Sequence, residues 1–126
     1  MPKQVPEIPR GVKPIGPYSI AAEAGGIVFV SGQVAIDPAT GQKVAGDASA
    51  QAGRIMENLS LVLEDLGLGF ADVVKTTIFL ADVADFAAVN EVYRRYFSDA
   101  PPARSTVQVG GLPGGFLVEI EAIAAR

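Results

Sequence analysis

The spacing of apolar residues changes along the chain, and two stretches have the period of an amphipathic helix. Over residues 48–66 apolar side chains recur at i, i+3, i+4 and i+7, which predicts a helix with one buried face. Asp47 is a candidate N-cap of this helix, and Gly67 stands where a C′ glycine belongs. A second apolar stripe predicts a helix over 83–97, capped by Asp82 and ended by the two prolines that follow.

Five other segments are rich in β-branched and apolar residues and are bounded by turn formers, as is typical of strands. They cover residues 18–23, 27–31, 73–80, 104–109 and 117–124. Gly25-Gly26 indicates a hairpin between the first two, and residues 37–41 indicate a turn. The order ββ-α-β-α-ββ predicts one α+β domain over 1–126, with both helices on one face of a sheet. The Pro-rich residues 1–13 are expected to be extended.

The last of these strands has two unlike faces. One row is apolar throughout and consists of Val118, Ile120, Ala122 and Ala124. The other row is mixed and consists of Leu117, Glu119, Glu121 and Ile123. Because the two helices can cover only one face of the sheet, a partly apolar second face suggests that subunits associate through it.

The composition excludes several classes of function. The 126 residues include no His and no Cys, which excludes disulfides, thiol nucleophiles, histidine bases and the usual transition-metal ligands. With 10 basic and 14 acidic residues, the net charge of −4 lacks the basic footprint of a nucleic-acid-binding protein. No apolar stretch has the length of a membrane span or of a signal-peptide core, so a cytoplasmic location is expected.

Eight segments, in order from about residue 14 to the C-terminus, resemble one known family. They are IGPYS (15–19), VFVSGQ (28–33), DPATG (37–41), ENLSLVLEDLG (57–67), VVKTTIFLAD (73–82), DFAAVNEVY (85–93), PPARSTVQV (101–109) and VEIEAIA (118–124). No single segment is diagnostic, but together they identify the chain as similar to the reactive-intermediate deaminase family, also called the Rid or YjgF family.

The resemblance implies a chorismate-mutase-like α+β fold with a mixed sheet, and a homotrimer whose sheets line a barrel with three sites between subunits. Members with deaminase activity hydrolyse 2-imino or 2-enamino acids to 2-keto acids and ammonia without a cofactor or a metal. The expected ligands are therefore small imino or keto acids, with neither nucleic acid nor membrane as a partner.

The same resemblance assigns residues to the site. Arg104 matches the arginine that holds the substrate carboxylate, and Glu119 matches the acid that positions or activates water. The remaining matches are substrate-binding positions, namely Tyr18 of the GPY motif, Ser31 and Gly32 of the SGQ turn, Asn90 of the second helix, and Thr106. Many deaminase-active relatives carry cysteine where Thr106 stands. The threonine excludes thiol chemistry here, but it keeps the backbone N–H and adds a hydroxyl.

These residue types suit the reaction. An imine carbon is electrophilic once its nitrogen is protonated, so the site needs a carboxylate clamp, an oriented water and a proton shuttle. The planar fork of Arg104 can bind a carboxylate through two hydrogen bonds, and Glu119 can accept a proton from water. A protein without histidine or cysteine can therefore catalyse the hydrolysis of an imine.

Other interpretations remain open from the residues alone. Arg104 and Glu119 could form a simple ion pair across strands. Tyr18 could be a half-buried strand aromatic, Asn90 an ordinary helix position, and Ser31-Gly32 a plain turn. A non-catalytic carboxylate-binding or chaperone-like protein could use the same residues. Ribonuclease activity, reported for some relatives, is disfavoured by the negative charge and the absence of histidine.

Overall fold

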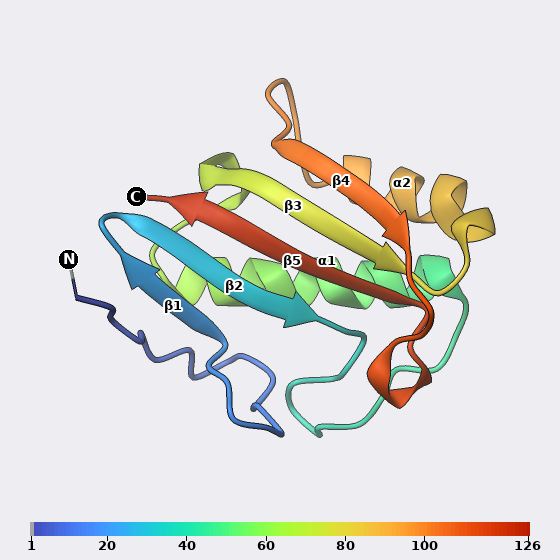
Figure 1. Cartoon of the computed structure of the whole chain (residues 1–126), viewed down its shortest axis with the longest axis horizontal. Helices are drawn as coiled ribbons and strands as arrows, with labels where there is room; N and C mark the ends of the chain where they lie inside the picture. The colour runs from blue at the N-terminus through green and yellow to red at the C-terminus, as the bar shows by residue number, and fades with distance from the viewer. Residues whose placement is uncertain (1) are drawn as a thin grey trace.

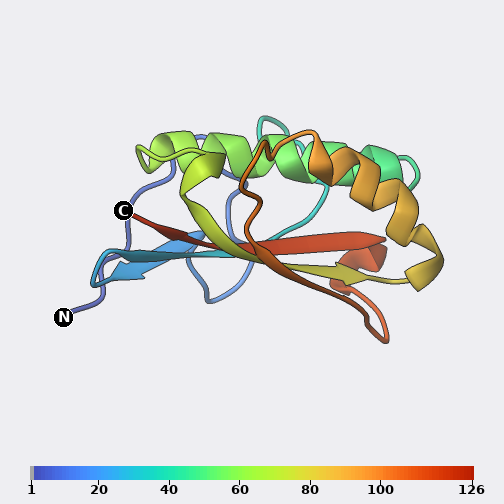
Figure 2. The ribbon, with the colours of Figure 1, turned by 90° about the horizontal axis from the view of Figure 1, so that it is seen from above.

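Two helices lie on one face of a five-stranded sheet in the computed structural model, which describes residues 2–126 (Figures 1 and 2). The strands are β1 (Ala21–Ala24), β2 (Ile27–Gln33), β3 (Val73–Leu80), β4 (Ala103–Gln108) and β5 (Val118–Ala125). Their order across the sheet is β1-β2-β5-β3-β4. The β3–β4 pair is parallel and the other three pairs are antiparallel. The predicted α+β class, with a mixed sheet and both helices on one face, is confirmed.

The long helix α1 (Ala48–Asp65) has the ends that its sequence predicts. The Asp47 carboxylate accepts a hydrogen bond of 2.9 Å from the backbone N–H of Ala50, which satisfies one of the free donors of the first turn. Gly67 has a φ of +76°, the left-handed conformation that glycine adopts at low cost just past a helix end. Both predicted ends are therefore confirmed.

The second helix is shorter than the predicted 83–97. Residues Val83–Asp85 form a 3₁₀ turn, capped as expected by the Asp82 carboxylate, which accepts from the Ala84 N–H at 2.9 Å. Regular α2 then runs over Phe86–Arg94. In this tighter turn the Asp85 backbone N–H donates to the Asp82 carbonyl oxygen three residues back, at 3.1 Å. No helix among residues 2–126 is long and apolar enough to cross a membrane.

The first hairpin corrects two strand boundaries. The strand predicted over 18–23 begins only at Ala21, which leaves Tyr18 in the preceding loop. Gly25 and Gly26 form the predicted turn with φ values of +60° and +81°. The second strand extends past the predicted 31 to Gln33, because its pairing with β5 resumes after an irregularity between Val30 and Gln33. The last two strands differ from the predicted ranges by one residue at each end: β4 begins and ends one residue earlier, and β5 begins and ends one residue later.

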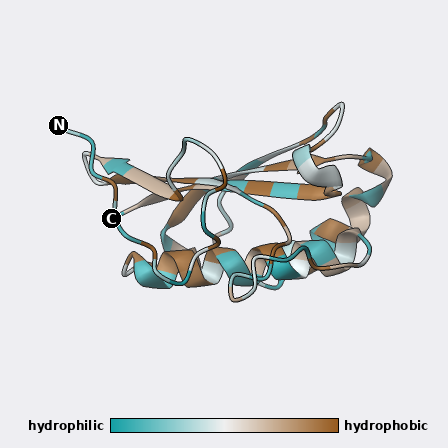
Figure 3. Cartoon of the chain, turned by 90° about the horizontal axis from the view of Figure 1, so that it is seen from below, coloured by the Kyte–Doolittle hydropathy of each residue, from teal (hydrophilic) through white to brown (hydrophobic). Residues whose placement is uncertain are grey.

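The two faces of the sheet differ as the last strand predicts. The helix-covered face is buried and contributes Val28, Ile78, Val118, Ile120, Ala122 and Ala124 to the core. The open face carries the exposed apolar side chains Ile27, Phe29 and Val107, with exposed fractions of 37%, 52% and 44%. Strands in Figure 3 show the corresponding alternation of hydrophobic and hydrophilic bands. The mixed character of the uncovered face is confirmed.

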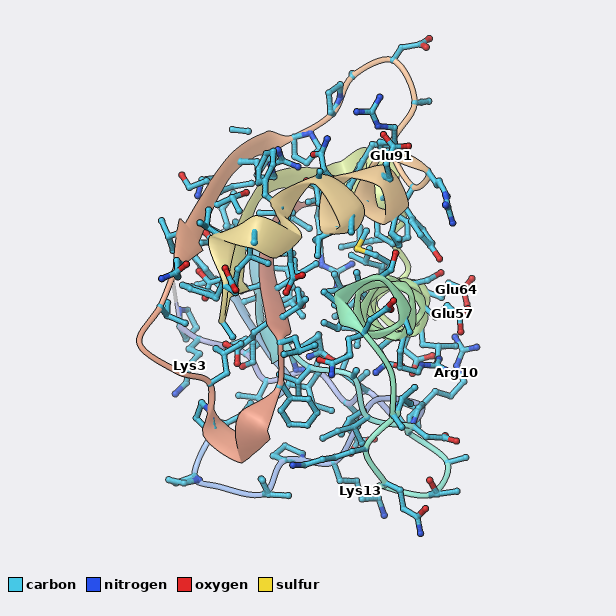
Figure 4. All side chains as sticks on the ribbon, turned by 90° about the vertical axis from the view of Figure 1, so that its right-hand side faces the viewer. Lys3, Arg10, Lys13, Glu57, Glu64 and Glu91 are labelled. Atoms are coloured by element: carbon cyan, nitrogen blue, oxygen red, sulfur yellow. The ribbon has the colours of Figure 1, made fainter. Side chains whose placement is uncertain are left out.

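The segment ahead of β1 is fastened to the rest of the chain. Gln4 exchanges two backbone hydrogen bonds of 2.8 and 2.9 Å with Glu23 of β1, and Ile8 is buried. Arg10 forms salt bridges with Asp65 at 2.7 Å and with Glu64 at 3.3 Å (Figure 4). The loop that carries Tyr18 is therefore anchored on both sides.

Candidate functional site

Arg104 lies on the helix-covered face of the sheet, against α2. It stands on β4 opposite Thr76 of β3, and its Nη1 donates a hydrogen bond of 2.8 Å to the Asn90 side-chain oxygen. The guanidinium carbon lies 4.9 Å from the ring centre of Tyr93 and 5.6 Å from that of Phe86. Cation–π contacts with two rings and a hydrogen bond fix the orientation of the fork. We call Phe86, Asn90, Tyr93 and Arg104 the Arg104 cluster.

Tyr93, one of the two rings that contact Arg104, is itself held in place. The Tyr93 side chain is buried, and its hydroxyl is 2.7 Å from Thr76 Oγ1. Burial raises the pKa of the Tyr93 phenol, so the ring stays neutral at physiological pH. Among residues 2–126, the Arg104 guanidinium donates no hydrogen bond except that to Asn90. Its other donors remain available beside a cavity of about 440 Å³ that Arg104 and Asn90 help to line.

Glu119 lies on the opposite, open face of the sheet. Its side chain lies over Gly32 of β2. A Cβ atom added to Gly32 would be only 2.7 Å from the Glu119 carboxyl carbon. A cavity of about 520 Å³ is lined by Tyr18, Ser31, Gly32 and Glu119 together with apolar side chains. We call these four residues the Glu119 cluster. The structure therefore brings together four of the expected site residues on this face.

The environment of Glu119 disfavours its negative charge. Partial burial raises the pKa of the Glu119 carboxyl, and the like charge of Glu121 raises this pKa further. A carboxylate with a raised pKa is a stronger proton acceptor than an ordinary glutamate, while it remains ionised at sufficiently high pH. Glu119 therefore has the electrostatic setting of a general base.

The neighbouring Ser31 has a structural partner. Its hydroxyl donates a 2.6 Å hydrogen bond to the Ser19 carbonyl oxygen, and its backbone N–H donates to the Ile20 carbonyl at 2.8 Å. Both contacts hold the loop of Tyr18 against β2. The Tyr18 side chain is itself 53% exposed at the rim of the cavity.

The two clusters do not meet within one chain. Arg104 pairs with Thr76, which pairs in turn with Ala122, so these three residues share the helix-covered face. Glu119 pairs with Phe79, which is an odd number of residues from Thr76 along β3. Because side chains alternate between the two faces, Glu119 points to the open face. The simple Arg104–Glu119 ion pair is therefore wrong for a single chain.

Thr106 lies two residues beyond Arg104 on the same strand and face. Its Oγ1 is buried and has no hydrogen-bond partner among residues 2–126. A buried hydroxyl without a partner is costly, so this atom has an unmet capacity for a donor or an acceptor.

Phe86 and Tyr93, which support the arginine, are not among the site residues expected from the sequence. They belong to the apolar stripe that predicts the second helix. Phe86, Asn90 and Tyr93 have the i, i+4, i+7 spacing that puts all three on one helix face, which was the available signal. Pro113 and Phe116 line the Glu119 cavity from the glycine-rich loop before β5, and they too were not expected.

Among residues 2–126 no group of three or more acidic side chains could hold a metal ion.

The comparisons with known proteins agree with this architecture. A sequence profile of the Endoribonuclease L-PSP family matches residues 9–126. The chain is 60% identical over 114 residues to Protein DfrA of Myxococcus xanthus, across 89% of this chain and 87% of that protein. It is 47% identical over 112 residues to the 2-iminobutanoate/2-iminopropanoate deaminase of Mus musculus, across 89% of this chain and 83% of that enzyme.

A solved structure shows the same fold. The conserved Rid-family protein of unknown function YyfA from Yersinia pestis matches with a TM-score of 0.95 and 42% identity, over 99% of this chain and 100% of that one. The fold is thus that of a small α+β protein with a half-covered mixed sheet. The chain belongs to the Endoribonuclease L-PSP family, which is the YjgF or Rid family, and the resemblance seen in its sequence is confirmed.

Replacing Asn90 with alanine is expected to weaken about tenfold the binding of any small carboxylate that Arg104 holds, because the fork of Arg104 loses its one fixed hydrogen bond. Isothermal titration with pyruvate or 2-oxobutanoate measures the affinity. Glu91→Ala is the matched control, since Glu91 is exposed on the same helix and, within the described residues 2–126, pairs only with Arg94. Equal affinities in Asn90→Ala and wild type would contradict a positioning role for Asn90.

Proposed function

We propose that this protein hydrolyses 2-imino and 2-enamino acids to 2-keto acids and ammonia. The observation that carries the proposal is the state of Arg104, a guanidinium held by two rings and Asn90 with its remaining donors free beside a cavity. Such a fixed and partly unpaired fork matches the geometry of a carboxylate. The name of the mouse relative, which is a deaminase of 2-iminobutanoate and 2-iminopropanoate, supports the same substrate class.

The proposed site combines residues of two subunits. Because Arg104 and Glu119 face opposite sides of one sheet, a substrate can touch both only where two copies of the chain meet. The Arg104 cluster and Thr106 come from one subunit, and the Glu119 cluster comes from its neighbour. The exposed apolar residues of the open face and the edge position of β4 support such an association. We propose the homotrimer that the family resemblance implies, with three equivalent sites.

The proposed reaction needs no group beyond these side chains. Arg104 and Thr106 hold the carboxylate and turn the imine carbon toward the Glu119 cluster. Glu119 accepts a proton from water as the water oxygen bonds to the carbon of the protonated imine, which gives a neutral carbinolamine. The same proton then passes from Glu119 to the amino nitrogen, and the C–N bond breaks to release ammonia. The hydroxyl proton passes through Glu119 to this ammonia, which leaves the keto acid and ammonium. A 2-enamino acid enters after protonation by solvent at its C3 atom, which converts it to the protonated imine.

A second candidate is a non-catalytic protein that binds small carboxylates. The free donors of Arg104 support binding as well as turnover, and the fold does not distinguish the two. The presence of Glu119 in the proposed site favours the enzyme, since a second carboxylate would repel the ligand carboxylate in a site built only for binding. Ribonuclease activity is a weaker candidate, because the chain has a net charge of −4 and no histidine.

The proposed function is tested by mixing the purified protein with a 2-imino acid generated in situ by an amino-acid oxidase. Wild type is expected to release keto acid faster than the spontaneous reaction, and Arg104→Ala is expected to lose both this activity and keto-acid binding. Arg104→Lys recovers little, because one ammonium cannot reproduce the fork. Hydrolysis at the spontaneous rate for several imino acids, with keto-acid binding intact, would favour the binding protein instead.

A further inference from the structure

A bulge in β2 forms the floor under Glu119. Val30 pairs with Ala122 and Gln33 pairs with Ile120, so Ser31 and Gly32 together oppose the single residue Glu121 of β5. Such a bulge bends its strand and re-aims the neighbouring side chains, and bulges of this kind recur beside active sites.

The side chain of Glu119 fills the space where a side chain at residue 32 would stand. A Cβ atom built on Gly32 would lie 2.7 Å from the Glu119 carboxyl carbon and 3.0 Å from its Cγ, and closer still to Oε2. These separations are well inside van der Waals contact, so the carboxyl group would have to move. The three nearest atoms all belong to this one side chain.

Backbone conformation does not explain the glycine. Gly32 is absent from the positive-φ glycines of residues 2–126, so its φ does not impose on alanine the strain that the φ of Gly25 or Gly67 would impose. The steric reason that the structure provides for glycine at this position is therefore the Glu119 side chain.

We propose that Gly32 is a positioning residue for Glu119, because the missing side chain leaves the room in which the carboxylate lies across β2. Gly32 then acts through Glu119 and not only through backbone contact with a ligand. The catalytic part of this inference rests on the proposed deaminase function, whereas the geometric part does not. The charged and titratable groups that line the same cavity are Lys13, Tyr18 and Glu121.

Gly32→Ala is expected to lower kcat for imino-acid hydrolysis by between about ten- and a hundredfold, since small displacements of a catalytic group have effects of this size. Keto-acid affinity should stay within about twofold of wild type, because alanine keeps the backbone N–H and C=O of residue 32 and Arg104 stands in the other cluster. A carbon-13 titration of the Glu119 carboxyl should show its pKa falling toward the ordinary value as the group is pushed toward solvent. Gly53→Ala is the matched control, since a Cβ atom at Gly53 meets nothing within 4 Å.

If the pKa of the Glu119 carboxyl in Gly32→Ala equals that in wild type, the inference is overturned, whether or not kcat falls. If Gly32→Ala is poorly folded, the double variant Gly32→Ala/Glu119→Ala decides, because the clash is gone and its melting temperature should match that of Glu119→Ala. A double variant that melts well below Glu119→Ala would also refute the steric relation. Should wild type itself lack turnover, the deaminase proposal fails while the titration still tests Gly32.

Discussion

Glu119→Gln is expected to bind 2-keto acids at least as tightly as wild type and to hydrolyse 2-imino acids about a hundred- to ten-thousand-fold more slowly. Glutamine keeps the size and most of the hydrogen bonding of the side chain, but it cannot accept a proton from water at neutral pH. Binding survives because Arg104 holds the carboxylate, and it can tighten because a negative charge near the ligand is removed. Steady-state kinetics and titration calorimetry measure the two effects separately.

The raised pKa of Glu119 adds a signature in pH and in stability. As a base, Glu119 must be ionised, so the activity should fall as the pH drops through its raised pKa. A carboxyl whose pKa is higher in the folded state favours folding at low pH, and this contribution disappears as the pH rises through the folded pKa. Glu119→Gln should therefore raise the melting temperature at neutral pH, and the gain should vanish in acid.

Two results would contradict this role of Glu119. Turnover by Glu119→Gln equal to that of wild type would exclude a general base at this position. A lower melting temperature at neutral pH would indicate that Glu119 is held by a stabilising ion pair across the interface. Glu121→Gln serves as control, because it removes the like charge that raises the pKa of Glu119. It should move the acidic limb of the activity profile to lower pH and retain most of the activity.

Co-assembly of Arg104→Ala and Glu119→Gln chains is expected to restore about a quarter of wild-type activity, although each variant alone is nearly inactive. An intact site needs Arg104 from one subunit and Glu119 from its neighbour. In a random equimolar mixture, roughly half of the subunits keep Arg104 and roughly half of their neighbours keep Glu119, which multiplies to about a quarter. The chains are mixed in denaturant and refolded together, and hydrolysis is measured per chain.

A second mixture makes the test quantitative. Wild type refolded with the double variant Arg104→Ala/Glu119→Gln should retain about a quarter of its activity if sites are shared, but about half if each site lies within one chain. Light scattering on the same samples reports the mass of the assembly. A monomer, or an absence of complementation in the first mixture, would rule out the shared site.

The elements that depend on local chemistry could be predicted from the sequence. The cap of α1 at Asp47 and the glycines of the first hairpin bond or bend within a few residues of themselves, so their neighbours suffice. The same holds for the two faces of β5, where alternation alone separates Ile120 from Glu119. The candidate residues themselves were found through the family resemblance, and their roles stay proposals.

The spatial relation of Arg104 to Glu119 could not be predicted, because it depends on which residues of β3 lie opposite each of them. Arg104 stands opposite Thr76 and Glu119 opposite Phe79, and the odd offset puts them on different faces. Register of this kind is set by contacts between strands distant in sequence. The same is true of the Gly32 contact with Glu119, which exists only because a bulge in β2 packs against β5.

The amino-acid sequence is thus enough to specify the α+β class, the helix and turn signals, the exclusion of thiol and histidine chemistry, and the family. The family follows from the eight segments in order, and the others follow from composition, from element order or from interactions within a few residues. Only the tertiary structure decided that Arg104 rests on Phe86 and Tyr93, that Glu119 lies over Gly32, and that one chain cannot join them. Strand pairing and helix packing bring these residues together across the chain, and no local pattern records the register in which they do so.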